Sequence, residues 1–247
     1  MEKIRLGVNI DHVATLRNAR DEGYPRILDI LKILKKVMVD SVTVHLREDR
    51  RHIKDNDVIL IKKKNLLPLN LEMAATKEMK EICLEIMPKS CCIVPERREE
   101  LTTEGGLDVK NQMNYLSNYL PDLLKKKIKV SLFIDPDLEQ IKAAKNLGVD
   151  SVELHTGKYS KLYKKKKHKA ELEKIIDASL FCSELGLKCH AGHGLDFSNA
   201  AKISSIKEVE ELNVGHFLIS NALFLGLENT IKKFMKIIKH PNHEKIK

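Results

Sequence analysis

Short apolar runs that each stop on a polar or ionisable residue recur along this chain of 247 residues. The runs read VNIDH, TVHLRED, LNLEMA, VELHTG, CHAGHG and LNVGH. In a barrel of parallel strands, the carboxyl ends of all strands open onto one face, so polar residues from distant runs would meet there. We therefore expect the functional residues on that face.

β-rich runs alternate along the chain with segments that carry apolar residues at helical spacing. The expected strands cover residues 4–10, 41–46, 69–73, 90–94, 129–134, 151–155, 187–191 and 209–214. The clearest helical patterns cover residues 27–38, 78–87, 138–148 and 171–186. Eight strand–helix units with right-handed crossovers favour an α/β protein with one domain over residues 1–247, a (β/α)₈ TIM barrel, rather than an open sheet.

Residues typical of helix ends support these expected helices. Thr76 and Asp135-Pro136 are placed to open helices, whereas Gly148 and Gly186 are placed to follow them. Segments 100–122 and 216–225 exceed a minimal barrel, and they predict additional helices or lids.

The formal net charge of +9 would suit nucleic acid, an acidic membrane surface or small anions. Much of it lies in lysine blocks at 62–64, 125–127 and 164–167, beside or within expected helices. Lysine stems there normally cover apolar surface while the ammonium stays in water, so a solvated outer face is the favoured interpretation. With 4% aromatic residues and no recognised nucleic-acid motif, we expect no nucleic-acid partner.

Nothing in the composition indicates a membrane or secreted protein. No run approaches the roughly 18 to 20 apolar residues of a membrane span, and the Met1-Glu2-Lys3 start lacks a secretory apolar region. The five cysteines form no CxxC pair. These features predict a cytoplasmic protein with reduced, buried thiols and no membrane partner.

The segment TVHLREDRRHI has the highest density of candidate functional residues. His45 and Arg47 are two residues apart and would share one face of an extended strand, with His52 following. Imidazole exchanges protons near neutral pH, and guanidinium binds phosphate in a fork. The alternative, a charged turn with a buried structural histidine, has about equal weight on these residues alone.

Carboxylates end two of the expected strands. Glu72 follows an apolar run and would be partly desolvated, which raises a carboxyl pKa and can make a working base. Its alternative is a helix-start glutamate favoured by the helix dipole. Glu153 repeats the situation, and His155 shares its side of the strand.

In CHAGHG, His193 stands between two glycines that would let the backbone approach a ligand closely. The alternative is a tight turn with an incidental histidine. Gly194 and, farther on, Gly215-His216 lead into expected helices, and phosphate commonly binds at helix starts after the last barrel strands. The residues thus predict a barrel enzyme that handles phosphorylated small molecules by acid–base chemistry.

The segments VNIDHVATLRNAR, TVHLREDRRHI, LNLEMA, VPERREELTTEGGLD, SLFIDPD, EQIKAA, VELHTG, AGHGL and ELNVGHFLI together resemble the pyridoxine 5′-phosphate synthase family, from about residue 4 to 238. The resemblance implies condensation of 1-deoxy-D-xylulose 5-phosphate with 3-amino-2-oxopropyl phosphate, giving pyridoxine 5′-phosphate, inorganic phosphate and water. It implies no metal and no redox cofactor. It also suggests an octamer built from dimers.

The resemblance also implies roles for individual residues. His45 and Glu72 would accept protons, His193 would donate one, and Glu153 would stabilise a transition state. Substrate-binding positions would be Asn9, Asp11, His12, Arg20, Arg47, His52, Thr102, Gly194, Gly215 and His216.

His190 departs from the family pattern, which has asparagine before AGHG, and this affects the local hydrogen bonding of its strand. Two other functions remain open on the residues alone. One is a different phosphosugar barrel enzyme with zinc held by His45, His190, His193 and carboxylates. The other is a non-enzymatic binding protein that uses its lysine surface.

Overall fold

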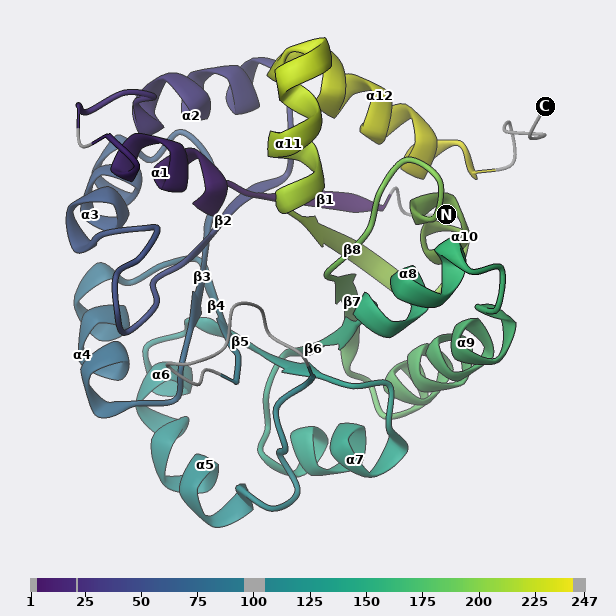
Figure 1. Ribbon diagram of the computed structural model, residues 1–247. Coiled ribbons are helices and arrows are strands. Elements are labelled where there is room, and N and C mark those ends of the chain that lie inside the picture. The colour runs from purple at the N-terminus through teal and green to yellow at the C-terminus, as the bar shows by residue number, and fades with distance from the viewer. Residues whose placement is uncertain (1–3, 21, 96–104, 242–247) are drawn as a thin grey trace.

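The computed structural model describes residues 4–20, 22–95 and 105–241. In these residues the strands pair in sequence order, every pair is parallel, and β8 returns to β1 to close the barrel (Figure 1). The strands are β1 (Arg5–Asn9), β2 (Ser41–His45), β3 (Leu69–Met73), β4 (Ser90–Ile93), β5 (Lys129–Ile134), β6 (Ser151–His155), β7 (Lys188–Gly192) and β8 (Val209–Val214). The predicted (β/α)₈ barrel is confirmed, and each strand lies within one or two residues of its expected bounds.

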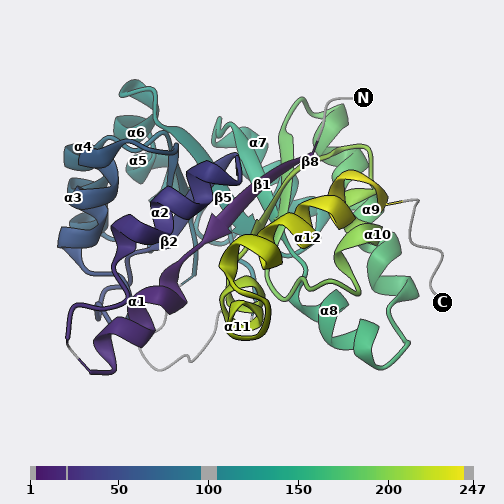
Figure 2. The same ribbon diagram turned by 90° about the horizontal axis from the view of Figure 1, so that it is seen from above.

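Helices lie around the barrel and across one of its ends. They are α1 (Asp11–Asn18), α2 (Ile27–Lys36), α3 (Asp55–Lys64), α4 (Lys77–Ile86), α5 (Met113–Tyr119), α6 (Pro121–Lys125), α7 (Leu138–Asn146), α8 (Gly157–Lys164), α9 (Lys169–Glu184), α10 (Ala200–Ser204), α11 (His216–Leu225) and α12 (Leu227–Lys239). Figure 2 places α1, α8 and α11 on the same side of the barrel. This is the side onto which the carboxyl ends of the strands open, so these three helices frame the mouth.

The outward faces of the strands make the hydrophobic core. Val8 of β1, Val44 of β2 and Leu71 of β3 are completely buried beneath the surrounding helices. Burial of a side chain of this size stabilises the fold by about 1.5 to 3 kcal/mol. The five cysteines are buried and free, as the sequence predicted.

The inward faces are polar, although barrels of this class are usually filled by branched apolar side chains. Ser90 donates to Oδ1 of Asn70 at 3.0 Å, and the amide of Asn70 donates to the Thr43 hydroxyl at 3.4 Å. Thr43 in turn donates to Oδ1 of Asn213 at 3.1 Å. A chain of hydrogen bonds therefore crosses the barrel interior from β4 through β3 and β2 to β8.

Most predicted helix ends are confirmed. The Thr76 side chain accepts a hydrogen bond from the Met79 amide and caps α4, while Gly148 and Gly186 follow helices with φ of 72° and 69°. The prediction that Asp135-Pro136 opens a helix was wrong. Asp137 caps α7 by accepting from the amides at 139 and 140, which leaves the Asp135 side chain available for other contacts.

The additional helices predicted in segments 100–122 and 216–225 are α5 with the start of α6, and α11. The three lysine blocks are exposed, which fits the solvated outer face that was expected. Among the described residues, no helix is long and apolar enough to cross a membrane.

Candidate active site

The first strand ends in a hydrogen-bonded turn. The amide of Asp11 donates to Oδ1 of Asn9, and Nδ2 of Asn9 donates back to Oδ2 of Asp11, both at 2.9 Å. The same Nδ2 lies 3.4 Å from Oε2 of Glu72 on β3. Asn9 therefore bridges two carboxylates that are far apart in the sequence.

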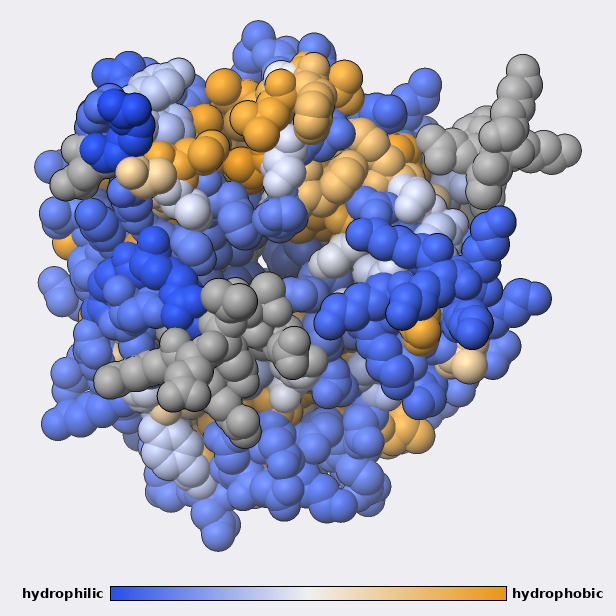
Figure 3. Space-filling model, viewed as in Figure 1, coloured by the Kyte–Doolittle hydropathy of each residue, from blue (hydrophilic) through white to orange (hydrophobic). Residues whose placement is uncertain are grey.

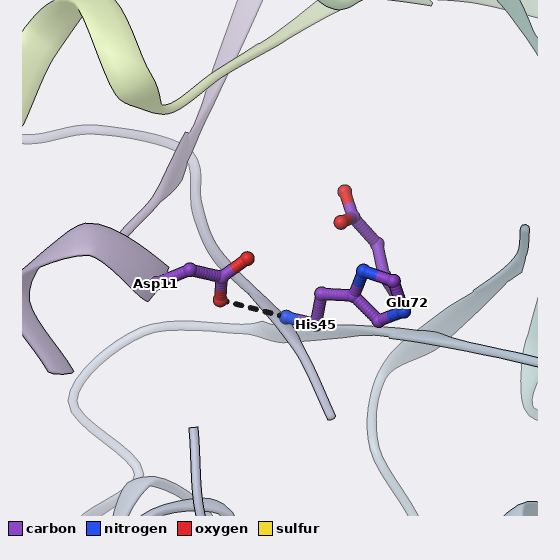
Figure 4. Close-up of side chains that lie close together, drawn as sticks. All are labelled: Asp11, His45 and Glu72. Atoms are coloured by element: carbon purple, nitrogen blue, oxygen red, sulfur yellow. Dashed lines mark hydrogen bonds between the residues drawn. The ribbon is translucent and has the colours of Figure 1, made fainter. Parts of the chain in front are cut away.

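Asp11, His45 and Glu72 converge at the mouth of the barrel (Figure 4). His45 and Glu72 are direct neighbours in the register of β2 and β3, and the buried Asp11 carboxylate accepts the backbone amide of His45 at 2.8 Å. Two predicted proton acceptors and one predicted binding residue are thus gathered on one side of the mouth.

Both carboxylates hold protons more tightly than usual. Burial raises the pKa of Asp11, despite the opposing effects of His45 and the Asn9 hydrogen bond. Burial, then the charges of Glu153 and Asp11, raise the pKa of Glu72 well above its ordinary value. A raised pKa brings a carboxyl group closer to the pH range in which it can exchange a proton with a substrate.

Asp11, His45 and Glu72 also offer ligand atoms within 4.8 Å of one another, the only such set among the described residues that could hold a metal ion. The zinc set considered from the sequence is not assembled. His190 lies deeper in the barrel, 3.4 Å from Arg5 and beside Glu211, so it is not gathered with His45. Any metal would have to displace the protons that burial favours on the two carboxyl groups.

Glu153 points into the barrel from β6 and is 3% exposed. Nδ2 of Asn213 donates to its Oε2 at 2.8 Å. Burial and the charge of Glu211 raise the pKa of Glu153 to about 8, so the group is largely protonated at neutral pH. A Cβ at Gly192 would meet Oε1 of Glu153 at 2.2 Å, which explains the glycine on the intervening strand.

His193 follows β7 with a φ of 78°, a left-handed conformation that is unusual for a residue with a side chain. The Thr156 hydroxyl lies 2.7 Å from both the Gly192 and His193 carbonyl oxygens, and the Thr156 amide also donates to Gly192. The turn after β6 therefore holds the end of β7 in place.

His193 is exposed at the mouth, yet the protein atoms packed around its ring displace part of the surrounding water. This desolvation, followed by the charges of His155, Lys161 and His216, lowers its pKa to about 4. The ring is neutral at pH 7, and a neutral imidazole still carries one N–H that can be donated.

Three further histidines, His12, His52 and His216, lie close together at the mouth. The His12 ring lies 4.8 Å from that of His216 and 5.7 Å from that of His52. Desolvation and these two neighbours lower the pKa of His12 to about 4, and its buried Nδ1 has no hydrogen-bond partner within the part of the chain that the structure describes. His52 is held by the Thr15 hydroxyl, 2.8 Å from its Nδ1.

The predicted arginines differ in position. Arg47 is 6% exposed and lies beside this histidine cluster, where it helps to lower the pKa of His52. Arg20 is exposed just after α1, and its guanidinium pairs with Glu22 at 3.0 Å. Thr102 lies outside the described residues.

Two backbone segments can receive an anion. Gly194, with φ of 79°, begins a loop in which Asp196 accepts the amides of Ser198 and Asn199. Gly215 precedes α11, and a Cβ there would collide with the Asn9 side chain at 2.8 Å. Helix starts expose unpaired N–H groups to which phosphate binds readily.

The sequence-based prediction missed several polar residues that support the site: Thr43, Asn70, Asp135, Thr156 and Asn213. A signal for Thr43, Asn70 and Asn213 was present in the sequence, because polar residues alternate with apolar ones in SVTVH, LNLEM and VEELNVGH. Alternation marks the inner face of a strand. Figure 3 shows the hollow at the centre of the mouth, bordered by polar side chains.

Comparison with known proteins gives a family and a set of relatives. A family model described as "Pyridoxal phosphate biosynthesis protein PdxJ" matches residues 6–240. Pyridoxine 5′-phosphate synthase of Ehrlichia ruminantium (strain Welgevonden) is 48% identical over 241 residues, which cover 98% of this chain and 100% of the relative. The synthase of Zymomonas mobilis is 50% identical over 232 residues, covering 94% and 90%.

Solved structures are similar in fold. 3-Keto-L-gulonate-6-phosphate decarboxylase from Vibrio cholerae aligns with a TM-score of 0.63 and 12% identity, covering 95% of this chain and 97% of that one. Orotidine 5′-monophosphate decarboxylase from Methanocaldococcus jannaschii aligns with a TM-score of 0.64 and 12% identity, covering 96% and 99%. At these identities the similarity shows the barrel fold alone.

Proposed function

The chain belongs to the PdxJ family of pyridoxal phosphate biosynthesis proteins and is an enzyme with pyridoxine 5′-phosphate synthase function, and from this premise we propose its substrates and residue roles. The substrates are 1-deoxy-D-xylulose 5-phosphate and 3-amino-2-oxopropyl phosphate. The products are pyridoxine 5′-phosphate, inorganic phosphate and water.

The observation that carries this proposal is the pairing of His45 with Glu72 on adjacent strands, beside the buried Asp11. Joining an amino ketone to a second ketone requires imine formation, loss of phosphate, addition and loss of water, and closure of a carbon–carbon bond. These steps require protons to be taken from the substrate at some atoms and given to it at others. A single base could therefore not serve all of them. His45 and Glu72 accept protons in this proposal.

The charge of the substrate decides when Glu72 acts as a base. Its raised pKa favours the protonated form in the unliganded site. A positively charged amine or iminium of the substrate would favour the carboxylate form, because an opposite charge within about 4 to 6 Å lowers a carboxyl pKa. Glu72 then accepts the proton that the substrate releases.

His193 and Glu153 act as donors to the substrate, whereas His45 and Glu72 accept protons from it. His193 donates a proton to the leaving oxygen. Glu153, protonated near neutral pH, donates a hydrogen bond that stabilises charge developing on an oxygen of the intermediate. Both residues are supported from neighbouring strands, His193 by Thr156 and Glu153 by Asn213.

Phosphate binding positions the two reactants. Arg47, His12, His52 and Asp11 surround one phosphate region, with Thr102 assigned there by the family resemblance. Gly194, Gly215 and His216 offer backbone amides for the other, and Asn9 and Arg20 complete the contacts to the amino ketone. Arg20 would have to leave Glu22 to do so. Holding two reactants in the correct relative position can lower the activation barrier by roughly 7 to 11 kcal/mol.

Assembly and location are also proposals. In α11 apolar residues lie on every side, yet Leu223 and Phe224 are 74% and 84% exposed. Figure 3 shows apolar residues gathered over this helix. A helix of this kind is normally buried, which supports association into the homo-octamer suggested by the family resemblance. Five free thiols support a cytoplasmic location.

The test is an assay of purified protein with both phosphorylated ketones and no added metal. Release of inorganic phosphate together with pyridoxine 5′-phosphate is the expected result. Binding of both substrates without product would overturn the reaction assignment. A parallel assay after chelation addresses the metal-dependent alternative, because the Asp11, His45 and Glu72 set would then lose activity with its ion.

A further inference from the structure

Asp135 and His155 form a hydrogen-bonded pair at the edge of the mouth. His155 is the last residue of β6 and is 6% exposed, while the Asp135 side chain, just after β5, is about half exposed. Oδ1 of Asp135 lies 3.0 Å from Nδ1 of His155. This bond lowers the pKa of Asp135, to which the Gly106 amide also donates. An ionised Asp135 therefore fixes the proton of His155 on Nδ1.

The other side of the His155 ring is enclosed and faces His193. Its Nε2 is buried and has no hydrogen-bond partner among the described residues. A Cβ at Gly157 would lie 2.5 Å from this Nε2 and 2.8 Å from Cδ2 of His193. The two imidazoles meet edge to face with centroids 5.0 Å apart, and Phe133 lies against both.

We propose that Asp135 and His155 are positioning residues that orient the ring of His193 and control whether that ring carries a charge. This inference rests on the proposed function, in which His193 donates a proton. Two positive charges on imidazoles 5.0 Å apart repel each other, so His155 opposes protonation of His193. His193 then remains neutral until an anionic substrate arrives.

The surroundings of His193 agree with this role. The positive or titratable groups that face it are His155 from β6, Lys161 from α8 and His216 from α11, and together with desolvation they lower its pKa. Of these, His155 has the largest effect and is the one with a carboxylate partner. A substrate phosphate at Gly194 would oppose all three charges.

A cavity of about 390 Å³ lies beside the pair, and its lining includes Asp135, Asp137, His155, Lys158 and Lys161. It lies apart from the Asp11, His45 and Glu72 cluster. Asp135 can therefore exchange protons with solvent without passing through the central mouth.

The test compares His155→Phe and Asp135→Asn with the wild type. Phenylalanine keeps the ring shape and the desolvation but removes both nitrogens, and asparagine removes the charge of Asp135. Asp137→Asn is the matched control, because it makes the same change two residues away and asparagine still caps a helix. Circular dichroism confirms folding, NMR titration gives the pKa of His193, and steady-state assays give kcat and KM.

His155→Phe is expected to raise the pKa of His193 toward the ordinary value of about 6.5, because it removes the neighbouring charge that lowers this pKa most. We expect kcat to fall about tenfold, less than the roughly 10²- to 10⁴-fold that a direct proton donor supplies, with little change in KM. An unchanged His193 pKa and an unchanged kcat in both variants would overturn the inference. If His155→Phe does not fold, Asp135→Asn, which alters a half-exposed side chain, decides the matter. An inactive wild type would refute the proposed function. The NMR titration would still test whether His155 affects the pKa of His193.

Discussion

The side-chain amide of Asn213 donates a hydrogen bond to Glu153 at 2.8 Å and so joins β8 to β6 across the intervening β7. Gly192 of β7 makes room for this contact. Because Asn213 also accepts from Thr43, Glu153 is the end of a chain of donors that starts at Ser90. The interior of this barrel thus holds a catalytic candidate by polar contacts instead of apolar packing.

Replacing Thr43 with valine should break the series of hydrogen bonds from Ser90 to Glu153 near its middle. The shape is kept, but the buried Asn213 Oδ1 loses its donor and the Asn70 amide loses its acceptor. An unsatisfied buried polar group costs about 1 to 3 kcal/mol, and we expect a loss of this size in the free energy of unfolding. Urea denaturation measures it. A variant as stable as the wild type would show that these bonds contribute nothing.

Replacing Glu153 with glutamine should stabilise the protein, and more so at pH 8 than at pH 5. The folded pKa is raised from 4.5 to about 8, so between these values the folded state holds a proton that the unfolded state has released. Wild-type stability therefore falls as pH rises through this window, by at most about 5 kcal/mol. Glutamine does not ionise and avoids the loss.

Urea denaturation at the two pH values measures this effect, with Glu173→Gln on the exposed face of α9 as the control. Equal stability gains at pH 5 and pH 8 would contradict the raised pKa.

Replacing Glu72 with glutamine should abolish most turnover while substrate binding persists. The glutamine oxygen can still accept from Asn9, but it cannot take a proton from the substrate. Loss of a general base typically lowers kcat by roughly 10²- to 10⁴-fold. Steady-state kinetics and calorimetric binding of each phosphorylated ketone check this, with Glu85→Gln on the exposed side of α4 as the control. Unchanged kcat would remove Glu72 from the mechanism.

Replacing Phe224 with serine should weaken the oligomer. Phe224 is 84% exposed on α11, and removing it from an interface loses buried apolar area. Light scattering should show a smaller species for this variant than for the wild type. Leu138→Ser, which changes a half-exposed apolar residue on α7, should leave the assembly intact. A wild type that is monomeric would refute the octamer directly.

The sequence by itself determined the barrel and the face that carries the chemistry. Strand positions follow from short apolar runs, and a parallel barrel brings all their carboxyl ends together. His45, Glu72, Glu153 and His193 could therefore be named from where the runs stop. These are local properties of the chain, since they depend on the spacing of neighbouring residues.

Only the tertiary structure decided which of these groups touch and what they contact. The Asp135–His155 pair joins residues 20 positions apart, and the bond between Asn213 and Glu153 joins residues 60 apart. The expected helix start at Asp135-Pro136 was wrong because Asp137 caps the helix and frees Asp135 for His155. Arg20, which was expected in the site, pairs with the exposed Glu22. Such contacts, and the pKa shifts that burial causes, depend on how strands are placed against one another, which no local spacing specifies.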